Sequence, residues 1–264
     1  MSRAGSATRS QTAGRAAFTI DAQTGRLLVE NPKRLPDGLR DALENRLGAG
    51  VAIACASPGR ALTLPPTSAD ELAAGPSVRL AGYWHDSLIE GPGRRSVAKL
   101  QGCPIHCRGC IAPESWNPTA GFFVPVNRLA DALLDPAYER DGVSLVGGEP
   151  TAQPTALLAL VRALRIRGCL HILLYSGYTC EALRRRAESQ AAIGAVLDEI
   201  DILIDGPYVA GLADSAGPWT GSGNQRVIDL AASRRLARVV LLARPEVVNS
   251  RANSTAENEA CQWS

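Results

Sequence analysis

Short apolar runs alternate with amphipathic helical patterns along residues 77–245 of this 264-residue chain. The runs whose length and composition predict strands are Val78–Trp84, Ser96–Gln101, Val143–Val146, Leu170–Tyr175, Ile200–Ile204 and Arg238–Leu242. Apolar residues at helical spacing predict helices near Val126–Leu134, Thr155–Ile166, Glu181–Ser189 and Ala191–Glu199. Strands that alternate with helices indicate βα units, a mostly parallel sheet and the α/β fold class. In such folds the functional side chains gather at the carboxyl ends of the strands.

A different pattern precedes this region and predicts a small, β-rich accessory module over residues 16–76. The runs Ala17–Ile20 and Arg26–Glu30 flank a turn-prone segment and predict a hairpin. A helix and two short strands, in that order, are expected at Asp37–Leu47, Val51–Cys55 and Ala61–Leu64. The polar segments 1–15 and 246–264 are interpreted as disordered tails. Residues 1–20 also lack acidic residues, as transit peptides do, but we prefer the interpretation of a polar tail.

The composition narrows the possible classes of function. The chain has 28 Lys and Arg residues against 26 Asp and Glu residues, which argues against a nucleic-acid-binding protein. The apolar runs are far shorter than a membrane-spanning helix needs. Seven cysteines are an odd number in a chain long enough to form a core, so we expect no disulfide framework. These features predict a cytoplasmic protein with no nucleic-acid or membrane partner, in which some cysteines serve a metal.

Three cysteines follow the predicted strand Ser96–Gln101 in a C-x3-C-x2-C pattern: Cys103, Cys107 and Cys110. Three thiolates so close in sequence can bind one metal centre, and thiolates favour zinc, copper(I) or iron–sulfur clusters. A structural zinc site usually has four protein ligands, and the remaining cysteines offer no second pair at such spacing. Three protein ligands leave one coordination position open, which a catalytic metal site requires.

A second motif, Gly147-Gly148-Glu149-Pro150, follows the predicted strand Val143–Val146. Glycines have no Cβ atom, so a ligand can approach the backbone closely. Pro150 favours an extended conformation at Glu149, whose carboxylate would stand at a strand end and bind an ammonium group. Alone, the tetrapeptide is also typical of a plain turn, and it gains weight from its pairing with the cysteine motif.

Together the two motifs resemble the radical S-adenosylmethionine (SAM) superfamily, and more specifically the activating enzymes of glycyl-radical enzymes. Within that group the chain is most similar to the activators of anaerobic ribonucleotide reductase. Further segments carry the resemblance across roughly residues 80–230: Glu90–Gly93, Gln101–Pro104, Pro113–Trp116, Tyr175–Thr179, Ile204–Tyr208 and Trp219–Ile228. The resemblance implies a partial (β/α) barrel of the radical SAM type over residues 77–245, preceded by the small N-terminal module.

The resemblance also implies roles for individual residues. Cys103, Cys107 and Cys110 would bind three irons of a [4Fe–4S] cluster, and the amino and carboxylate groups of SAM would hold the fourth iron. The residues expected to contact SAM are Gly147, Gly148 and Glu149 at its amino group, Gly109 and Ile111 along its adenine, and Ser176 and Asp205 at its methionine or ribose part. Asn224, Gln225 and Arg226 match the family without a firm role; Arg226 would hold the SAM carboxylate or satisfy backbone carbonyls.

The activity implied by the resemblance is that of a radical SAM oxidoreductase. SAM would be cleaved reductively at the cluster to a 5′-deoxyadenosyl radical, which would abstract hydrogen from a glycine of a partner glycyl-radical enzyme. A flavodoxin- or ferredoxin-type protein would donate the electron. Two alternatives stay open: a radical SAM enzyme that modifies a peptide or small molecule, and a non-catalytic metal-binding module. The basic stretch 184–186 is interpreted as a solvated helix face, with docking of an acidic electron donor as the alternative.

Overall fold

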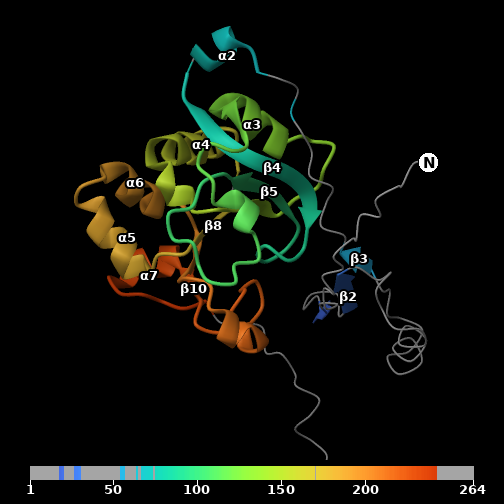
Figure 1. The fold of residues 1–264 in the computed structure, drawn as a ribbon, viewed down its shortest axis with the longest axis vertical. Helices are drawn as coiled ribbons and strands as arrows, with labels where there is room; N and C mark the ends of the chain where they lie inside the picture. The colour runs from blue at the N-terminus through green and yellow to red at the C-terminus, as the bar shows by residue number, and fades with distance from the viewer. Residues whose placement is uncertain are drawn as a thin grey trace, which may run out of the picture.

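The computed structural model describes residues 18–20, 27–30, 54–56, 64, 67–73, 75–169 and 171–242. Most of these residues form a mixed seven-stranded sheet covered by helices (Figure 1). A separate three-stranded sheet consists of β1 (Phe18–Ile20), β2 (Leu27–Glu30) and β3 (Ala54–Ala56). β1 and β2 are antiparallel, which confirms the predicted hairpin, and β3 pairs in parallel with β2. The predicted helix Asp37–Leu47, both predicted tails and most of the predicted strand Ala61–Leu64 lie outside the described residues.

The strands of the large sheet lie in the order β10-β9-β8-β7-β5-β4-β6. Their bounds in chain order are β4 Ser77–Ser87, β5 Arg95–Leu100, β6 Phe122–Pro125, β7 Gly142–Gly147, β8 Ile172–Ser176, β9 Ile202–Asp205 and β10 Arg226–Asp229. The four central strands, β5, β7, β8 and β9, are parallel. β10 pairs antiparallel with β9, β4 pairs antiparallel with β5, and β6 pairs antiparallel with β4 at the edge. The α/β class is therefore confirmed as a mixed sheet with a parallel centre.

The antiparallel flanks differ from the mostly parallel sheet that the sequence pattern predicts. Only residues 88–94 connect β4 to β5, and so short a connection cannot make the crossover that parallel neighbours need. β6 and β10 have four residues each, and neither was predicted. The predicted strand Arg238–Leu242 is wrong: these residues contribute an isolated bridge from Leu241 to Ile228. They follow α7 through a left-handed residue, Ala237, and run beside β10 instead of beginning a new strand.

One face of the sheet is covered by α3 Val126–Leu133, α4 Pro154–Ile166, α5 Cys180–Ala187, α6 Ala191–Glu199 and α7 Leu230–Leu236. The short helix α2, Ala69–Ala73, buries none of its residues. Short 3-10 turns occur at η2 Pro113–Ser115, η3 Pro150–Ala152 and η4 Ala210–Ser215. The four predicted helices are confirmed to within two residues at each end. In the part of the chain that the structure describes, no helix combines the length and apolar character needed to cross a bilayer.

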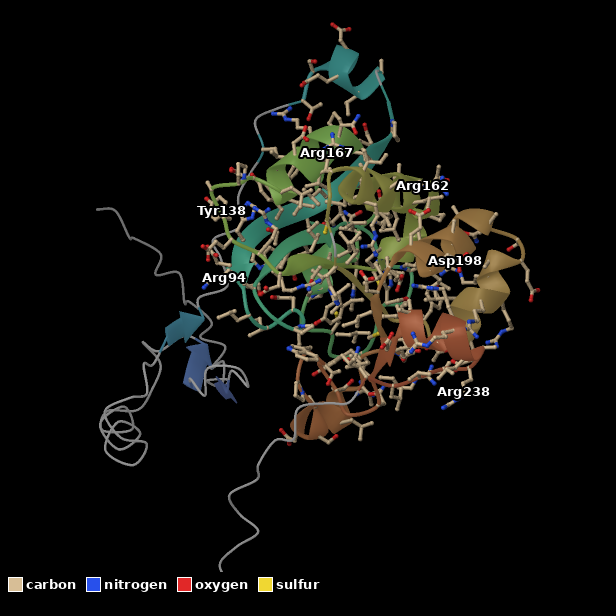
Figure 2. All side chains as sticks on the ribbon, turned by 180° about the vertical axis from the view of Figure 1, so that it is seen from behind. Arg94, Tyr138, Arg162, Arg167, Asp198 and Arg238 are labelled. Carbon is tan, nitrogen blue, oxygen red and sulfur yellow. The ribbon has the colours of Figure 1, made fainter. Side chains whose placement is uncertain are left out.

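Each long helix follows from its sequence pattern. In α4, Pro154 occupies the first turn, where its missing N–H is no loss, and Leu157, Leu160 and Leu164 are buried along one face. On the exposed side of α4, Arg162 (Figure 2) pairs with Glu199 of α6 at 2.8 Å. Such an exposed ion pair contributes only about 0.2–1 kcal/mol, so the buried leucines hold the helix in place.

Side chains alternate between the two faces of the parallel strands. Leu145, Leu174 and Leu203 belong to the large apolar cluster beneath the helices. Leu173 and Ile204, each one position away, belong to a smaller cluster on the opposite face. This alternation follows from the two-residue period of a strand and determines which side chains at the strand ends lie under the helices.

The register of the parallel strands aligns their carboxyl ends. Leu100 pairs with Gly147, and Ser176 pairs with Asp205. Leu145 pairs with Leu174, so the same register carried two residues further brings Gly147 beside Ser176. The predicted site residues of three strands therefore lie in one row, and the cysteine loop begins directly after the fourth.

A buried arginine, Arg95, closes the opposite end of the sheet. Its Nε donates to the Ser144 hydroxyl at 2.9 Å, and Nη2 donates to the Val143 carbonyl at 2.6 Å. Nη1 lies 2.9 Å from Nδ1 of His171 and also reaches the Pro92 carbonyl. Burial lowers the pKa of Arg95 to about 10, so the group stays charged near neutral pH. Because an arginine can only donate, Nδ1 of His171 must be an unprotonated acceptor.

This contact predicts a loss of stability at mildly acidic pH. Burial, with the nearby charge of Arg95, lowers the pKa of His171 below its usual value of 6.5. As the pH falls below 6.5, the unfolded chain binds a proton here while the folded chain does not, so the free energy of unfolding decreases. His171→Asn keeps an acceptor for Arg95 but cannot titrate. Anaerobic urea unfolding at pH 7.5 and 5.5 should show a smaller decrease for the variant than for the wild type.

The wild type must be compared with His171→Asn, because Glu149 changes the free energy of unfolding with pH in the opposite direction to His171. Burial raises the pKa of its carboxyl, which favours the folded state as the pH falls. This contribution is common to the wild type and the variant and cancels in their difference. An equal pH dependence in both proteins would contradict the contact between Arg95 and neutral His171.

Candidate functional site

The cysteine loop leaves the carboxyl end of β5 and is fixed at its start by backbone hydrogen bonds. Gly102 N donates to the Ser115 carbonyl at 2.9 Å, and Cys103 N donates to the Trp116 carbonyl at 3.1 Å. The side chain of Gln101 adds bonds from Nε2 to the carbonyls of Glu114 and Asn117. The segment that enters the loop and the segment that leaves it are therefore joined like a short hairpin.

The three cysteines of the motif are free thiols and partly exposed. Cys110 N donates to the Cys107 carbonyl at 3.1 Å, which closes a tight turn between these two residues. Burial raises the pKa of the Cys103 thiol, and the nearby Glu149 and Cys107 add to this effect. Among the described residues, no three His, Cys, Asp or Glu side chains already surround a common metal position.

The chemistry of the donor set still fits an iron–sulfur cluster with one open iron. Three unpaired thiols stand on one loop, and iron–sulfur clusters are bound through cysteine thiolates. The loop can curl tightly because Gly109 has φ +75°, a conformation that side chains with a Cβ atom rarely adopt. Cys103, Cys107 and Cys110 are therefore the residues that would hold the cluster.

The turn Gly147–Pro150 lies directly against the beginning of the cysteine loop. Gly148 N donates to the Leu100 carbonyl at 2.9 Å, and Glu149 N donates to the Gly102 carbonyl at 2.8 Å. A Cβ atom on Gly147 would lie 2.2 Å from the Leu100 carbonyl oxygen, and one on Gly148 would lie 2.3 Å from that of Gly102. In this structure the two glycines admit the backbone of the cysteine loop, whereas the sequence suggested only room for a ligand.

The carboxylate of Glu149 is fully buried and surrounded by hydrogen-bond donors. Oε1 accepts from Thr151 N at 3.0 Å and from the Thr151 hydroxyl at 2.6 Å. Oε2 accepts from Gly177 N at 2.8 Å. The Ser176 hydroxyl lies 3.1 and 3.0 Å from the two oxygens. Burial raises the pKa of this carboxyl, and the four donors partly offset that rise because they stabilise the anion.

These contacts give Glu149 a structural role beside the predicted one. Its side chain caps the 3-10 turn η3 and ties the end of β7 to the end of β8. Gly177 in turn approaches the cysteine loop, because a Cβ atom there would lie 2.6 Å from Cδ1 of Ile105. The structure therefore brings Glu149, Ser176, Gly147 and Gly148 together beside the cysteine loop.

Asp205 has contacts other than those that the sequence suggested. Its carboxylate accepts from Arg226 through Nε at 2.9 Å and Nη2 at 2.5 Å, and from Cys180 N at 2.6 Å. It lies two positions beyond Leu203, on the helix-covered face of the sheet, and binds the N-terminus of α5. A contact of Asp205 with SAM stays a prediction, and the observed role is structural.

Arg226 binds two carboxylates, neither of which the sequence suggested. Besides Asp205, it contacts both carboxylate oxygens of Glu181, at 3.1 and 2.7 Å. These bonds hold the pKa of Glu181 down to about 2. Asn224 and Gln225 organise the preceding loop through bonds to the carbonyls of Pro207 and Gly206. The matching segment around Arg226 therefore fastens β10 to β9 and α5.

The two residues predicted to lie along adenine, Gly109 and Ile111, are both exposed. Ile111 is 80% exposed, which is unusual for a large apolar side chain. A Cβ atom on Gly109 would lie 3.1 Å from the Cβ of Ala210, the first residue of η4. The contacts of both residues with adenine stay predictions.

Two contacts near the site were not predicted from the sequence. Thr151 bonds to Glu149 as described above, and Arg186 bonds to Thr151 at 2.9 Å. The contact of Thr151 with Glu149 could have been found from the sequence, because Thr151 directly follows the Glu149-Pro150 pair. The inward orientation of Arg186 was hidden, because three consecutive arginines are typical of a solvated helix face.

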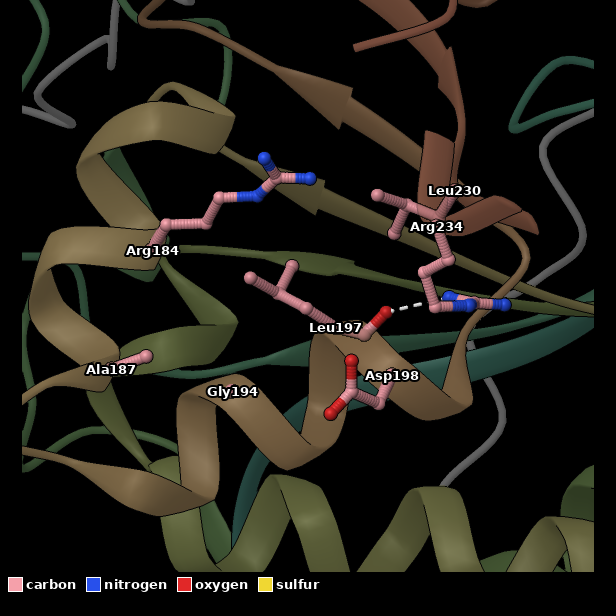
Figure 3. A pocket seen from close by; sticks show the side chains of 7 residues that line it. All are labelled: Arg184, Ala187, Gly194, Leu197, Asp198, Leu230 and Arg234. Atoms are coloured by element: carbon pink, nitrogen blue, oxygen red, sulfur yellow. Dashed lines mark hydrogen bonds between the residues drawn. The ribbon is translucent and has the colours of Figure 1, made fainter. Parts of the chain in front are cut away.

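Two cavities among the described residues lie apart from the predicted site residues. One of about 150 Å³ lies between α5, α6 and α7 (Figure 3), where Arg234 donates to the Leu197 carbonyl at 2.8 Å. Another, of about 260 Å³, lies beside Gly142 and Cys169 at the amino ends of the parallel strands. Both lie away from the cysteine loop, so neither forms part of the predicted site.

Comparison with known proteins identifies a family and several relatives. The family model described as 4Fe-4S single cluster domain matches residues 89–228. An anaerobic ribonucleoside-triphosphate reductase-activating protein of Vibrio cholerae is 32% identical over 150 residues, which cover 54% of this chain and 92% of the relative. The protein of that name from Escherichia coli K12 is 32% identical over 152 residues, 55% of this chain and 94% of the relative. A pyruvate formate-lyase-activating enzyme of Clostridium pasteurianum is 33% identical over 95 residues, 34% of this chain and 40% of that protein.

The contacts of Asp205 predict that it stabilises the fold. Asp205→Asn should decrease the free energy of unfolding by about 1–3 kcal/mol, because Arg226 and the N-terminus of α5 lose a buried negative partner. Glu181→Gln is the matched control: it removes an exposed carboxylate from the same arginine and should cost less than about 1 kcal/mol. Anaerobic urea unfolding measures both. Unchanged stability of Asp205→Asn, together with weaker SAM binding, would contradict the structural role and favour direct contact with SAM.

Proposed function

The chain belongs to the 4Fe-4S single cluster domain family and to that of the anaerobic ribonucleoside-triphosphate reductase-activating proteins, and on this premise we propose its function. It is a radical SAM enzyme of the type that activates glycyl-radical enzymes, with a [4Fe–4S] cluster and SAM as its cofactors. The substrate is a glycine of a partner glycyl-radical enzyme of the anaerobic ribonucleotide reductase type. A flavodoxin- or ferredoxin-type electron donor and a cytoplasmic location, which suits free thiols, complete the proposal.

The observation that carries the proposal is the direct attachment of the Gly147–Pro150 turn to the cysteine loop. Glu149 N donates to the carbonyl of Gly102, the residue directly before Cys103 of the motif. A cluster-binding loop and a buried carboxylate are thereby held side by side. This juxtaposition supports a site for a cationic amino acid ligand next to an iron–sulfur cluster, and it has no purpose in a simple metal-binding module.

The residues of this chain have distinct tasks in the proposed reaction. The thiolates of Cys103, Cys107 and Cys110 hold the cluster and leave one iron for SAM. Glu149 binds the amino group of SAM, and Gly147 and Gly148 let the two loops meet. The cluster, once bound and reduced by the electron donor, would supply the electron for reductive cleavage of SAM and thereby the radical chemistry that removes the glycine hydrogen.

The proposal keeps the domain division suggested by the sequence. Residues 77–245 form the radical SAM domain, a partial (β/α) barrel, and residues 16–76 form an accessory module that precedes it; polar tails, 1–15 and 246–264, flank the two. The open sheet with four parallel central strands supports the barrel assignment. Contacts of Gly109 and Ile111 with adenine, and of Ser176 and Asp205 with the rest of SAM, belong to the same proposal.

Removal of a single loop cysteine tests the cluster assignment. Cys107→Ala should lose bound iron and sulfide after anaerobic reconstitution, because two remaining thiolates cannot hold the cluster as three do. With dithionite and SAM, it should form no 5′-deoxyadenosine above background. Cys169→Ala, which removes a buried thiol away from the loop, should retain both properties. Full iron content and product formation in Cys107→Ala would overturn the assignment.

Neutralisation of the buried carboxylate tests the SAM site. Glu149→Gln keeps the shape of the side chain but should weaken SAM binding by about tenfold or more, because the amino group loses a charged partner. Equilibrium dialysis of SAM against the reconstituted protein measures the dissociation constant. Iron content and the midpoint of urea unfolding report whether the fold and cluster are intact. Unchanged SAM affinity in an intact variant would contradict the role of Glu149.

A further inference from the structure

We propose that Arg186 and Thr151 are positioning residues for the Glu149 carboxylate, and that they keep it oriented to bind the amino group of SAM. This inference rests on the proposed function and assigns work to two residues outside the predicted site. Arg186 belongs to the last turn of α5, and Thr151 belongs to η3. Three groups therefore form a chain of contacts from the helix layer to the buried carboxylate.

The contacts in this chain are short and specific. Nη1 of Arg186 donates to the Thr151 hydroxyl at 2.9 Å, and Nη2 donates to the Thr151 carbonyl at 3.3 Å. The Thr151 hydroxyl lies 2.6 Å from Oε1 of Glu149. Thr151 and Glu149 are both buried, whereas Arg186 is half-buried and reaches inward from the surface.

The chemistry of the donors determines the direction of every bond in the chain. A guanidinium group has donors only, so the Thr151 oxygen must accept from Arg186. The single hydroxyl proton of Thr151 is then free to point at Glu149. Because a carboxylate can only accept, Thr151 is the donor in this bond. Without Arg186, this hydroxyl could rotate to another acceptor and leave Oε1 short of a donor in a buried site.

Arg186 is itself held in place on a second side. Its guanidinium lies over the ring of Tyr178, with Cζ 4.3 Å from the ring centroid. The backbone N–H of Tyr178 donates to the Ser176 hydroxyl at 3.1 Å, so this ring belongs to the loop that also faces Glu149. Arg184 and Arg185, which precede Arg186 in the chain, are exposed. Of the three consecutive arginines, Arg186 is thus the one built into the site.

The arrangement also selects the oxygen that remains available to a ligand. A carboxylate oxygen has about two acceptor sites, and the amide and hydroxyl of Thr151 fill those of Oε1. With Oε1 filled, Oε2 accepts from the Gly177 amide and from the Ser176 hydroxyl, so an ammonium group would bind at Oε2 by replacing the Ser176 proton, the one donor there that can rotate away. Thr151, held by Arg186, therefore keeps Oε1 occupied and leaves Oε2 as the oxygen at which the ammonium group of SAM would bind.

A ligand that lacks the amino group provides the decisive test. The probes are SAM and its deaminated analogue, in which a keto oxygen replaces the amino group, each bound to the anaerobically reconstituted full chain. The measured quantity is the ratio of their dissociation constants. Arg186→Met and Thr151→Val should each reduce the preference for SAM about tenfold, since a disordered hydroxyl weakens one charged hydrogen bond. The double variant should lose no more than either single variant, because both act through the same contact.

Conservative and neighbouring substitutions serve as controls. Thr151→Ser keeps the hydroxyl and should keep the preference for SAM, and Arg186→Lys keeps one donor and should recover most of it. Arg185→Met removes the same charge from the adjacent position and should leave the preference within twofold of the wild type. A merely structural role of Arg186 would weaken both ligands equally and would leave their ratio unchanged.

The outcomes separate this inference from the proposed function. If Glu149→Gln loses the preference for SAM while Arg186→Met and Thr151→Val keep it, the positioning role is overturned and the SAM site stands. If the wild-type protein shows no preference for SAM over the deaminated analogue, the role of Glu149 falls and the inference falls with it. Loss of the preference in all three variants, with Arg185→Met unaffected, supports the inference.

Discussion

The contact on which the rest of the site depends is the backbone pairing between residues 100–102 and the turn Gly147–Glu149. Two amide–carbonyl bonds join these segments, from Gly148 N to the Leu100 carbonyl and from Glu149 N to the Gly102 carbonyl. The two glycines permit this approach, because a Cβ atom on either would overlap the neighbouring carbonyl. Register then aligns the remaining strand ends, so one close backbone contact places the cysteine loop beside a buried carboxylate and brings the β8 loop to both.

Burial of Glu149 imposes a second constraint, since a carboxylate without water needs donors from the protein. Four donors surround it, and each comes from a segment next to the cysteine loop or from the turn that Glu149 itself caps. The same bonds that stabilise the anion tie β7 to β8. Recognition of a cationic ligand and the stability of the fold therefore depend on one side chain, and substitutions there must be interpreted with a measurement of stability beside the measurement of binding.

The sequence predicted the parallel core well because its signal is local. The apolar runs of β5 and β7, the helical spacing in α4 and α6, and the two motifs at strand ends each lie within a few residues. Edge strands such as β6 and β10 have four residues, and their pairing with distant strands leaves little trace in the local pattern. The strand predicted at Arg238–Leu242 failed for a different reason: an apolar run can lie along a sheet edge without forming a ladder.

The site residues divide in the same way. The cysteines and the Gly147–Pro150 turn each lie within a short stretch of sequence, so their spacing indicated a metal centre beside a strand end, and the family resemblance supplied their specific chemistry. Asp205 and Arg226 are 21 residues apart and meet only through the antiparallel register of β9 and β10, which the sequence did not predict. Arg186 and Thr151 are 35 residues apart and meet because the Arg186 side chain reaches from the last turn of α5 to η3. Three consecutive arginines suggest a solvated helix face when only composition is known. The direction of each side chain on the helix shows that Arg186 turns inward while Arg184 and Arg185 do not. Residues that position a reactive group are therefore harder to predict than the group itself, because their signal lies in packing and not in spacing.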